Sequence, residues 1–448
     1  MLRLISAIGL LVMILLAWLL SSNRRRFPLR VVAGGTALQL GVAALILKTE
    51  RGQSIFTSIG NFFTTLLGFV DQGCSFVFGD QYTDFYFAFR VLPTIIFFSS
   101  LMAILYHFGI IQFVVRVLAR VMQVTLRTSG AESLSAAANI FVGQTEAPFV
   151  VLPYISRMTR SELMAVMVGG FATVAGGVLA VYIGFGIPAR HLITASFISA
   201  PAGLVIAKVM QPEDESEQTS NAMTDCVPKQ TVNVIEAATH GAAEGLKLAL
   251  NVAAMMIAFL ALIALADYIL GHCSSWVMTH LLQQQDAEPI TLAWCFGRLF
   301  SPLAFLMGIE SKDCLAAGEL LGLKMAANEL LAYKQMADWT VEADAVATAQ
   351  LIHLQLASMQ PGCSGIVTAP AVNCIPDQMR MLSPRSVVIM TYALSGFANF
   401  ASIGIQVGGI GGLAPERRQD LARLGLRAML GGTLACCMTA CVAGILIA

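Results

Sequence analysis

The chain has 448 residues, of which 57% are hydrophobic and only 12% are charged, and its mean hydropathy is +0.74. Soluble domains carry about a quarter charged residues, so this composition indicates an integral membrane protein. The 27 basic and 27 acidic residues balance, and no basic tract suggests a nucleic-acid partner. The ten cysteines show no CxxC pair and no His/Cys ligand spacing, so neither a zinc site nor a redox motif is indicated.

Apolar segments of about 20 residues, the length that crosses a bilayer, recur along the chain. The first has no small-residue cleavage site and ends at a run of three arginines, which favours a retained membrane helix over a signal peptide. Residues 55–70 are apolar but interrupted by polar side chains, and we expect them to lie in the membrane interface as an amphipathic helix. The eight predicted spans are 4–20, 31–47, 92–115, 163–187, 192–210, 246–270, 387–407 and 428–448.

The placement of Lys and Arg predicts the orientation of these spans. Residues 273–289 and 337–378 contain no Lys or Arg, so both stretches are expected to face outward, as are both termini. Cys363 and Cys374 lie in the second stretch, where they would pair in an oxidising periplasm or stay as free thiols. The basic clusters expected on the cytoplasmic side are 24–30, 116–127, 157–160 and 417–427.

Two polar segments are the most informative part of the sequence. Residues 132–154 suffice for one crossing, yet their centre is Gly143-Gln144-Thr145-Glu146-Ala147-Pro148. As a re-entrant hairpin, two half-helices of about 12 residues would each reach roughly 18 Å and turn at this polar tip. Such a tip is tolerated where it is buried in protein or lines a wet cavity, and a kinked spanning helix is the alternative. Residues 291–333, with Asn328-Glu329 towards their end, are expected to form a matching hairpin.

A seven-residue pattern follows each polar segment. Residues 170–176 read GFATVAG and residues 396–402 read GFANFAS. The first hairpin is flanked by basic residues and the second by the outward stretches, so the two halves should have opposite topology. An inverted repeat that pairs a buried acid with a broken helix is typical of secondary transporters. Coincidence among small residues that pack helices together is the alternative for the heptad alone.

Ionisable side chains inside a membrane are costly and usually functional, which singles out Glu146 and Glu329. No Lys or Arg accompanies them in these motifs, so the site should disfavour anions. It suits a neutral solute bearing hydroxyl or amide groups, or a cation. Backbone carbonyls freed at the glycines, together with the Thr173 hydroxyl and Asn139, would coordinate a hard cation. Close helix packing is an equally simple reading of the glycines.

Three motifs resemble the signatures of concentrative nucleoside transporters: residues 143–148 (GQTEAP), 328–333 (NELLAY) and 396–400 (GFANF). The resemblance extends from about residue 88 to the C-terminus. It implies a multi-pass protein of the bacterial inner (plasma) membrane and a homotrimer with mobile transport domains. It also implies inward movement of a nucleoside with a cation, sodium first, by an elevator-like motion. No cofactor other than the coupling ion is implied.

The resemblance also assigns roles to individual residues. Gln144, Thr145 and Glu146 would face the base. The ribose would be held by Glu329, Asn399 and Ser402, with Phe397 and Val178 lining the pocket. The implied sodium ligands are the Asn139 side chain, the Val142 and Val174 carbonyls and the Thr173 hydroxyl.

The fold class that follows is an all-α membrane protein with about eight spans, two re-entrant hairpins and an inverted repeat. A proton-coupled carrier, in which Glu146 or Glu329 is protonated, is one alternative function. Others are a membrane enzyme with these acids as a general acid–base pair, and, more weakly, a channel. The expected divisions are 1–128 (scaffold), 129–212 (first repeat), 213–289 (linker and scaffold helix) and 290–448 (second repeat, with the insertion 337–378).

Overall fold

The computed structural model describes all residues except 145, 215–230, 281–289, 341–381 and 448, and the described part is helical without strands. Seven of its helices are long and apolar enough to cross a membrane. They overlap seven of the eight predicted spans, so the all-α membrane fold is confirmed. Residues 163–187 and 387–407 were each predicted as a single span, but each is a broken helix: the helix that begins at Arg160 ends at Ala172, and the helix that begins at Pro384 ends at Leu394.

The N-terminal helices are α1 (Leu2–Leu19), α2 (Leu29–Lys48) and α3 (Glu50–Phe78). The last of these contains the predicted interfacial segment 55–70 and is longer at both ends. Thr49 begins α3, because its hydroxyl accepts a hydrogen bond from the Gly52 amide. Its interfacial position stays a prediction.

The predicted span 92–115 is in fact two helices, α4 (Leu92–His107) and α5 (Ile110–Leu126). The chain turns at Gly109, whose φ of 78° is a left-handed conformation that glycine adopts without a steric penalty. The Gly109 amide donates to the Tyr106 carbonyl and closes the turn. A hydropathy pattern cannot detect this turn, because Gly109 is flanked by apolar residues on both sides.

Two halves of the chain repeat one order of elements. In the first, α5 is followed by a hairpin of α6 (Gly130–Ala138), α7 (Ala147–Val150) and α8 (Leu152–Ile155). The broken helix α9 (Arg160–Ala172)/α10 (Gly176–Gly184) and then α11 (Ala189–Met210) follow. In the second, α13 (Leu292–Leu306) precedes a hairpin of α14 (Cys314–Ala326) and residues 329–340. The broken helix α16 (Pro384–Leu394)/α17 (Phe400–Leu413) and then α18 (Arg418–Leu446) complete it. One further helix precedes each half: α4 precedes the first and α12 (Val234–His280) precedes the second. These two helices pack against each other.

The two halves run in opposite directions. At its start α9 meets the start of α18, where Arg160 pairs with Asp420 at 3.6 Å. The start of α16 meets the end of α18 instead, where Arg385 donates to the carbonyls of Gly444 and Ile447 at 2.6 and 2.7 Å. Because α9 and α16 therefore point opposite ways along α18, the predicted inverted repeat is confirmed.

Several details of the repeat differ from the expectation. The first hairpin has a nine-residue helix and two single-turn helices in place of two 12-residue halves. The second hairpin begins only at Cys314, because residues 292–306 form the separate helix α13, the counterpart of α5. Residues 273–280, predicted as an outward loop, belong to α12. The insertion, with Cys363 and Cys374, lies almost wholly outside the described residues.

The matching heptads do not occupy equivalent positions in the two broken helices. Gly170 lies inside α9, two residues before it ends, whereas Gly396 lies in the break after α16. Aligning the breaks places Ala175 opposite Asn399, since each is the N-cap of the second half-helix. The order of helices therefore repeats in the two halves. The two heptads, however, do not align with each other when the helices of the two halves are aligned.

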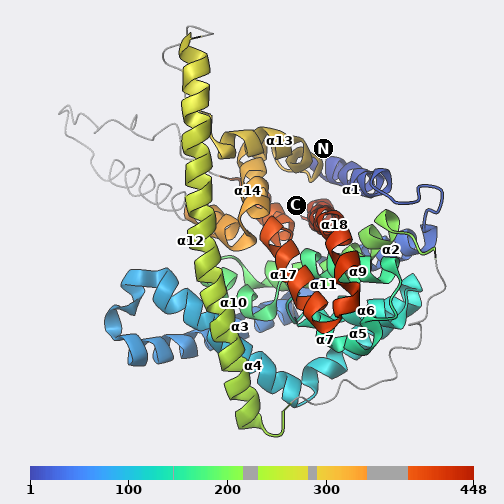
Figure 1. Ribbon diagram of the computed structural model, residues 1–448, viewed down its shortest axis with the longest axis vertical. Helices are drawn as coiled ribbons and strands as arrows, with labels where there is room; N and C mark the ends of the chain where they lie inside the picture. The colour runs from blue at the N-terminus through green and yellow to red at the C-terminus, as the bar shows by residue number, and fades with distance from the viewer. Residues whose placement is uncertain (145, 215–230, 281–289, 341–381, 448) are drawn as a thin grey trace, which may run out of the picture.

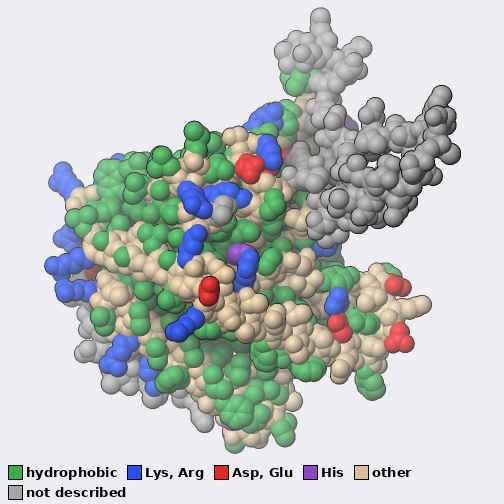
Figure 2. All heavy atoms as spheres, turned by 180° about the vertical axis from the view of Figure 1, so that it is seen from behind, with side chains coloured by type: hydrophobic (Ala, Val, Ile, Leu, Met, Phe, Trp, Pro, Cys, Tyr) green, Lys and Arg blue, Asp and Glu red, His purple; other side chains and the backbone are tan. Residues whose placement is uncertain are grey.

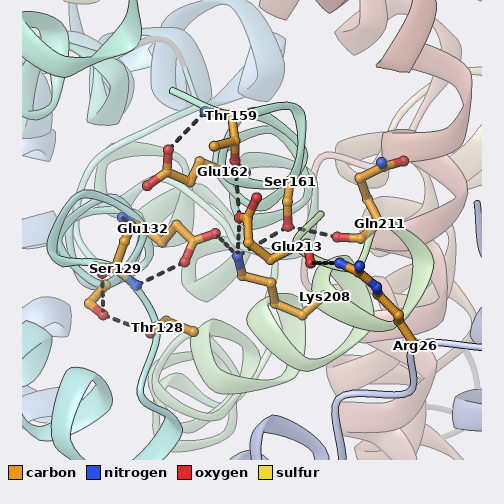
Figure 3. Close-up of polar contacts among 11 residues, drawn as sticks. Arg26, Thr128, Ser129, Glu132, Thr159, Ser161, Glu162, Lys208, Gln211 and Glu213 are labelled. Carbon is orange, nitrogen blue, oxygen red and sulfur yellow. Dashed lines mark hydrogen bonds and ion pairs between the residues drawn. The ribbon is translucent and has the colours of Figure 1, made fainter. Parts of the chain in front are cut away.

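Arginines of three predicted cytoplasmic clusters lie at one end of the molecule, since Arg26 pairs with Asp214 and Arg160 pairs with Asp420 of the C-terminal cluster region. Arg417 donates to the carbonyl of Met158 at 2.6 Å, and Arg427 donates to that of Met210 at 2.9 Å. Between them lies a buried ion-pair cluster, in which the Lys208 ammonium contacts the carboxylates of Glu132 and Glu213 (Figure 3). It joins the first hairpin to the end of α11. The opposite end holds both termini, where Arg3 donates to the Ile447 carbonyl (Figure 1).

The outer surface is strongly apolar. The 47-residue α12 extends along the whole long axis of the molecule (Figure 1), and side chains such as Ile257 and Leu262 are exposed on it. Hydrophobic side chains also cover much of the reverse face (Figure 2). Apolar areas of this extent mark contact with lipid or with another protein. The core instead lies around α9, α11 and α18, where the spans are mostly buried.

Candidate functional site

Glu329 lies at the start of the returning limb of the second hairpin, and its side chain is buried. Each of its carboxylate oxygens accepts one hydrogen bond: Oε1 from the Tyr182 hydroxyl at 3.0 Å and Oε2 from the Asn399 amide at 3.2 Å. Tyr182 comes from α10 and Asn399 from the break before α17. The acid is therefore held between the two repeats, with lone pairs left for further donors.

Asn399 and Gln144 continue this hydrogen-bonded network. The Asn399 Oδ1 accepts from the Ser402 amide at 2.9 Å and so caps α17. Gln144, at the tip of the first hairpin, donates from Nε2 to the Ser402 Oγ at 3.0 Å. Its Oε1 accepts from the Gln406 Nε2, also at 3.0 Å. We call the chain Gln406–Gln144–Ser402–Asn399–Glu329 the polar wall; it contains groups from both hairpin tips and one break.

Two glycines permit the close approach on which the polar wall depends. A Cβ at Gly170 would lie 2.7 Å from the Gln406 Nε2 and 3.0 Å from the Gln144 Cβ. A Cβ at Gly396 would lie 2.6 Å from the Phe171 carbonyl oxygen. The break of the second repeat thus rests directly on the last turn of α9. Gly396 therefore requires glycine, because the atom in the way is main chain, whereas a Cβ at Gly170 would displace the Gln406 amide from its place in the wall.

An uncharged oxygen cluster lies where the first hairpin tip meets the first break. The Gly176 amide donates to the Phe141 carbonyl at 3.0 Å and fixes the tip to the break. The Asn139 Nδ2 donates to the Ser135 carbonyl, and its buried Oδ1 has no partner among the described residues. The Thr173 hydroxyl gives its proton to the Gly169 carbonyl at 2.8 Å, which leaves its oxygen lone pairs available.

The oxygen cluster suits a hard monovalent cation. The same tip and break also carry the carbonyls of Val142 and Val174, to which the described backbone offers no donor, and we include them with Asn139 and Thr173 under this name. Oxygen donors are what hard cations prefer, and an orphaned buried amide oxygen is costly unless something binds it. The described residues hold no group of three or more His, Cys, Asp or Glu side chains placed for a metal ion. Two side-chain oxygens and two main-chain carbonyls, all uncharged, are a donor set that fits sodium.

The structure brings some predicted site residues together and separates others. Gln144, Glu329, Asn399 and Ser402 share the polar wall. Val178 is buried one turn before Tyr182 on the same face of α10, and Phe397 is half-buried in the break. Glu146 is exposed, and its carboxylate accepts from the Gly143 amide at 3.3 Å within its own tip. Thr145 lies outside the described residues.

Three residues of the site escaped the sequence reasoning: Tyr182, Gln406 and Lys324. Lys324 is buried at the end of α14 and donates to the Ala393 carbonyl, close to the end of α16, at 2.9 Å. Lys324 and Gln406 carried a usable signal, because each is a polar side chain in an apolar helix one turn from a motif residue. Tyr182 carried none, since a tyrosine in an apolar segment is typically an interfacial or core residue.

Comparison with known proteins identifies the family of this chain. Residues 191–444 match the family model described as Na+ dependent nucleoside transporter C-terminus, and residues 8–81 match the corresponding N-terminus. Residues 88–189 match a model named Gate, described as nucleoside recognition. The chain is 43% identical to an uncharacterised transporter of Haemophilus influenzae, over 99% of this chain and 97% of that one.

Two further relatives extend the comparison. Solute carrier family 28 member 3 of Homo sapiens is 40% identical over 99% of this chain, which spans 60% of the human protein. A structure of CNTnw in an inward-facing substrate-bound state has a TM-score of 0.83 and 39% identity, covering 100% of this chain and 98% of that one. CNTnw variants in an outward-facing state give the same TM-score. The chain is therefore a multi-pass membrane protein of the plasma membrane that belongs to the Na+ dependent (concentrative) nucleoside transporter family, and it is not an enzyme.

Proposed function

We propose that this protein imports nucleosides by symport with sodium and works by an elevator-like movement of its repeats. Gln144, Thr145 and Glu146 would face the base, with Val178 and Phe397 lining the pocket. Glu329, Asn399 and Ser402 would hold the ribose. Sodium would bind the oxygen cluster, through the Asn139 and Thr173 side chains and the Val142 and Val174 carbonyls. The assembly would be a homotrimer.

One observation supports the proposal most strongly: the first hairpin tip supplies residues to both the polar wall and the oxygen cluster, and these residues lie against the neighbouring Gly169 and Gly170 of α9. Gln144 belongs to the wall, whereas Asn139 and Val142 belong to the cluster. The wall contains one fixed acid and several amides, so it matches a neutral solute with hydroxyl groups. Carboxylates accept hydrogen bonds from hydroxyls strongly, which suits a ribose diol at Glu329.

The test is uptake of labelled uridine into proteoliposomes that contain the purified protein. We expect accumulation with an inward sodium gradient and none with an equal potassium gradient. Glu329→Gln should reduce uptake at least tenfold, because a neutral amide binds hydroxyls more weakly than a carboxylate. The matched control is Glu50→Gln on the exposed first turn of α3, which should transport normally. Accumulation driven only by a pH gradient would refute sodium coupling, and equal effects of both variants would refute the site.

A further inference from the structure

Gln406 is a buried amide on α17, one helical turn beyond Ser402, and the three residues between them are apolar or glycine. Only 1% of its surface is exposed. Its Nε2 donates both to the Gln144 Oε1 at 3.0 Å and to the Met167 carbonyl at 3.2 Å. A buried amide is costly unless it is hydrogen-bonded, and here both bonds reach outside its own helix. Gln406 thus connects α17 to α9 and to the first hairpin tip.

The Met167 carbonyl fixes the direction of every hydrogen bond along this part of the wall. A main-chain carbonyl can only accept, so it requires the NH2 group of Gln406. The same NH2 group meets Gln144, which must therefore present its oxygen to Gln406 and its own NH2 group to Ser402. The Ser402 hydroxyl accepts that bond at 3.0 Å and keeps its proton for another acceptor.

A second main-chain group fixes the other part of the wall. The Ser402 amide can only donate, so Asn399 must turn its oxygen towards it and its NH2 group towards Glu329. The orientation of each side-chain amide from Gln406 to Asn399 is thereby determined. The Gln144 and Asn399 NH2 groups each keep a second proton, and the Gln406 Oε1 has no partner among the described residues. Among the described residues, no acceptor is found for the proton of the Ser402 hydroxyl, which is the one hydroxyl of the wall.

We propose that Gln406 is a positioning residue that fixes the amide orientation of Gln144 and so reserves the Ser402 hydroxyl as a donor to an oxygen of the bound solute. This inference rests on the proposed function, in which that oxygen belongs to a ribose. Without Gln406, the Gln144 amide is free to rotate by 180° and turn its oxygen to Ser402. The Ser402 hydroxyl would then donate its proton to Gln144 and could not donate to the solute.

The test compares the binding of uridine with that of 2′-, 3′- and 5′-deoxyuridine to the purified full-length protein in saturating sodium. In the wild type, removing the hydroxyl that faces Ser402 should weaken binding about three- to tenfold, the worth of one hydrogen bond. Gln406→Met has nearly the same length and no donor, and it should remove most of this discrimination. Ser402→Ala should remove it too, and the double variant should show no further change. The matched control is Gln39→Met, since Gln39 is equally buried but bonds Thr439 on α18.

The outcomes separate this inference from the function on which it rests. If the wild type binds none of the four nucleosides, the proposed function fails and the inference fails with it. If the wild type discriminates and Gln406→Met discriminates equally well, only the inference is overturned. An equal loss of discrimination in Gln39→Met would also overturn the inference. Discrimination would then depend on the packing of any buried glutamine and not on the hydrogen bonds of Gln406. A further loss in the double variant would show that Gln406 does not act through Ser402.

Discussion

Removal of the Lys208 ammonium should destabilise the protein more than removal of any exposed lysine. Its side chain is 5% exposed and that of Glu132 is fully buried, while Glu213 lies 3.2 Å away (Figure 3). Opposite charges about 3 Å apart attract by about 5 kcal/mol at an effective dielectric constant of about 20. Lys208→Met also leaves Glu132 uncompensated in the interior. Loss of one partner of a buried pair costs about 3–5 kcal/mol.

The assay is the apparent melting temperature of the purified variants, measured at one scan rate because membrane proteins unfold irreversibly. Lys208→Met should melt several degrees below the wild type. Lys247→Met, which breaks an exposed pair with Glu244, should cost about 0–1 kcal/mol and hardly shift the transition. Adding Glu132→Gln to Lys208→Met should restore much of the lost melting temperature, since the double variant no longer buries an unpaired Glu132 carboxylate. Equal melting of Lys208→Met and Lys247→Met would refute the reasoning.

Three further predictions concern the two sites. Asn139→Ala removes the orphaned amide oxygen and should raise the sodium concentration for half-maximal uridine uptake at least tenfold; an unchanged value would contradict the cation assignment. Tyr182→Phe removes one donor to Glu329 and should weaken uridine binding about three- to tenfold without changing the melting temperature by more than a degree or two. Gly396→Ala places a methyl group against the Phe171 carbonyl and should abolish uptake, whereas Gly404→Ala, where a Cβ has open space, should leave uptake intact.

The sequence predicted the parts of this protein that depend on composition and local pattern. Seven spans, the opposed halves and the grouping of the arginines all follow from hydropathy and charge. The polar cluster around Gln144 and the Asn328-Glu329 pair identified both hairpin tips. These features can be predicted from the sequence because lipid excludes charged side chains and irregular backbone unless protein surrounds them.

What the sequence could not predict depends on tertiary contacts. The turn at Gly109 and the separate helix α13 lie in apolar segments, where a helix end leaves no charge signal. The hydrogen bond from the Gly143 amide to Glu146 within the first hairpin tip could not be predicted either, and the place of Glu146 beside the solute stays a prediction. Gln406 stood out as a polar side chain in an apolar helix, but its partners, Gln144 and the Met167 carbonyl of α9, come from distant parts of the chain. Such partners are set by helix packing, which periodicity does not encode.

The contact between Gly396 and the end of α9 bears on how the binding of sodium and the binding of nucleoside could be coupled. The peptide of Phe171 and Ala172 lies against Gly396 on one side and leads directly into Thr173 on the other. If sodium binds as proposed, a cation that draws in the Thr173 oxygen would shift the surface on which the second break rests, three residues before Asn399. By linkage, a cation that tightens nucleoside binding in this way would have its own binding tightened by nucleoside by the same factor. The coupling proposed here would run through the main chain that the two sites share.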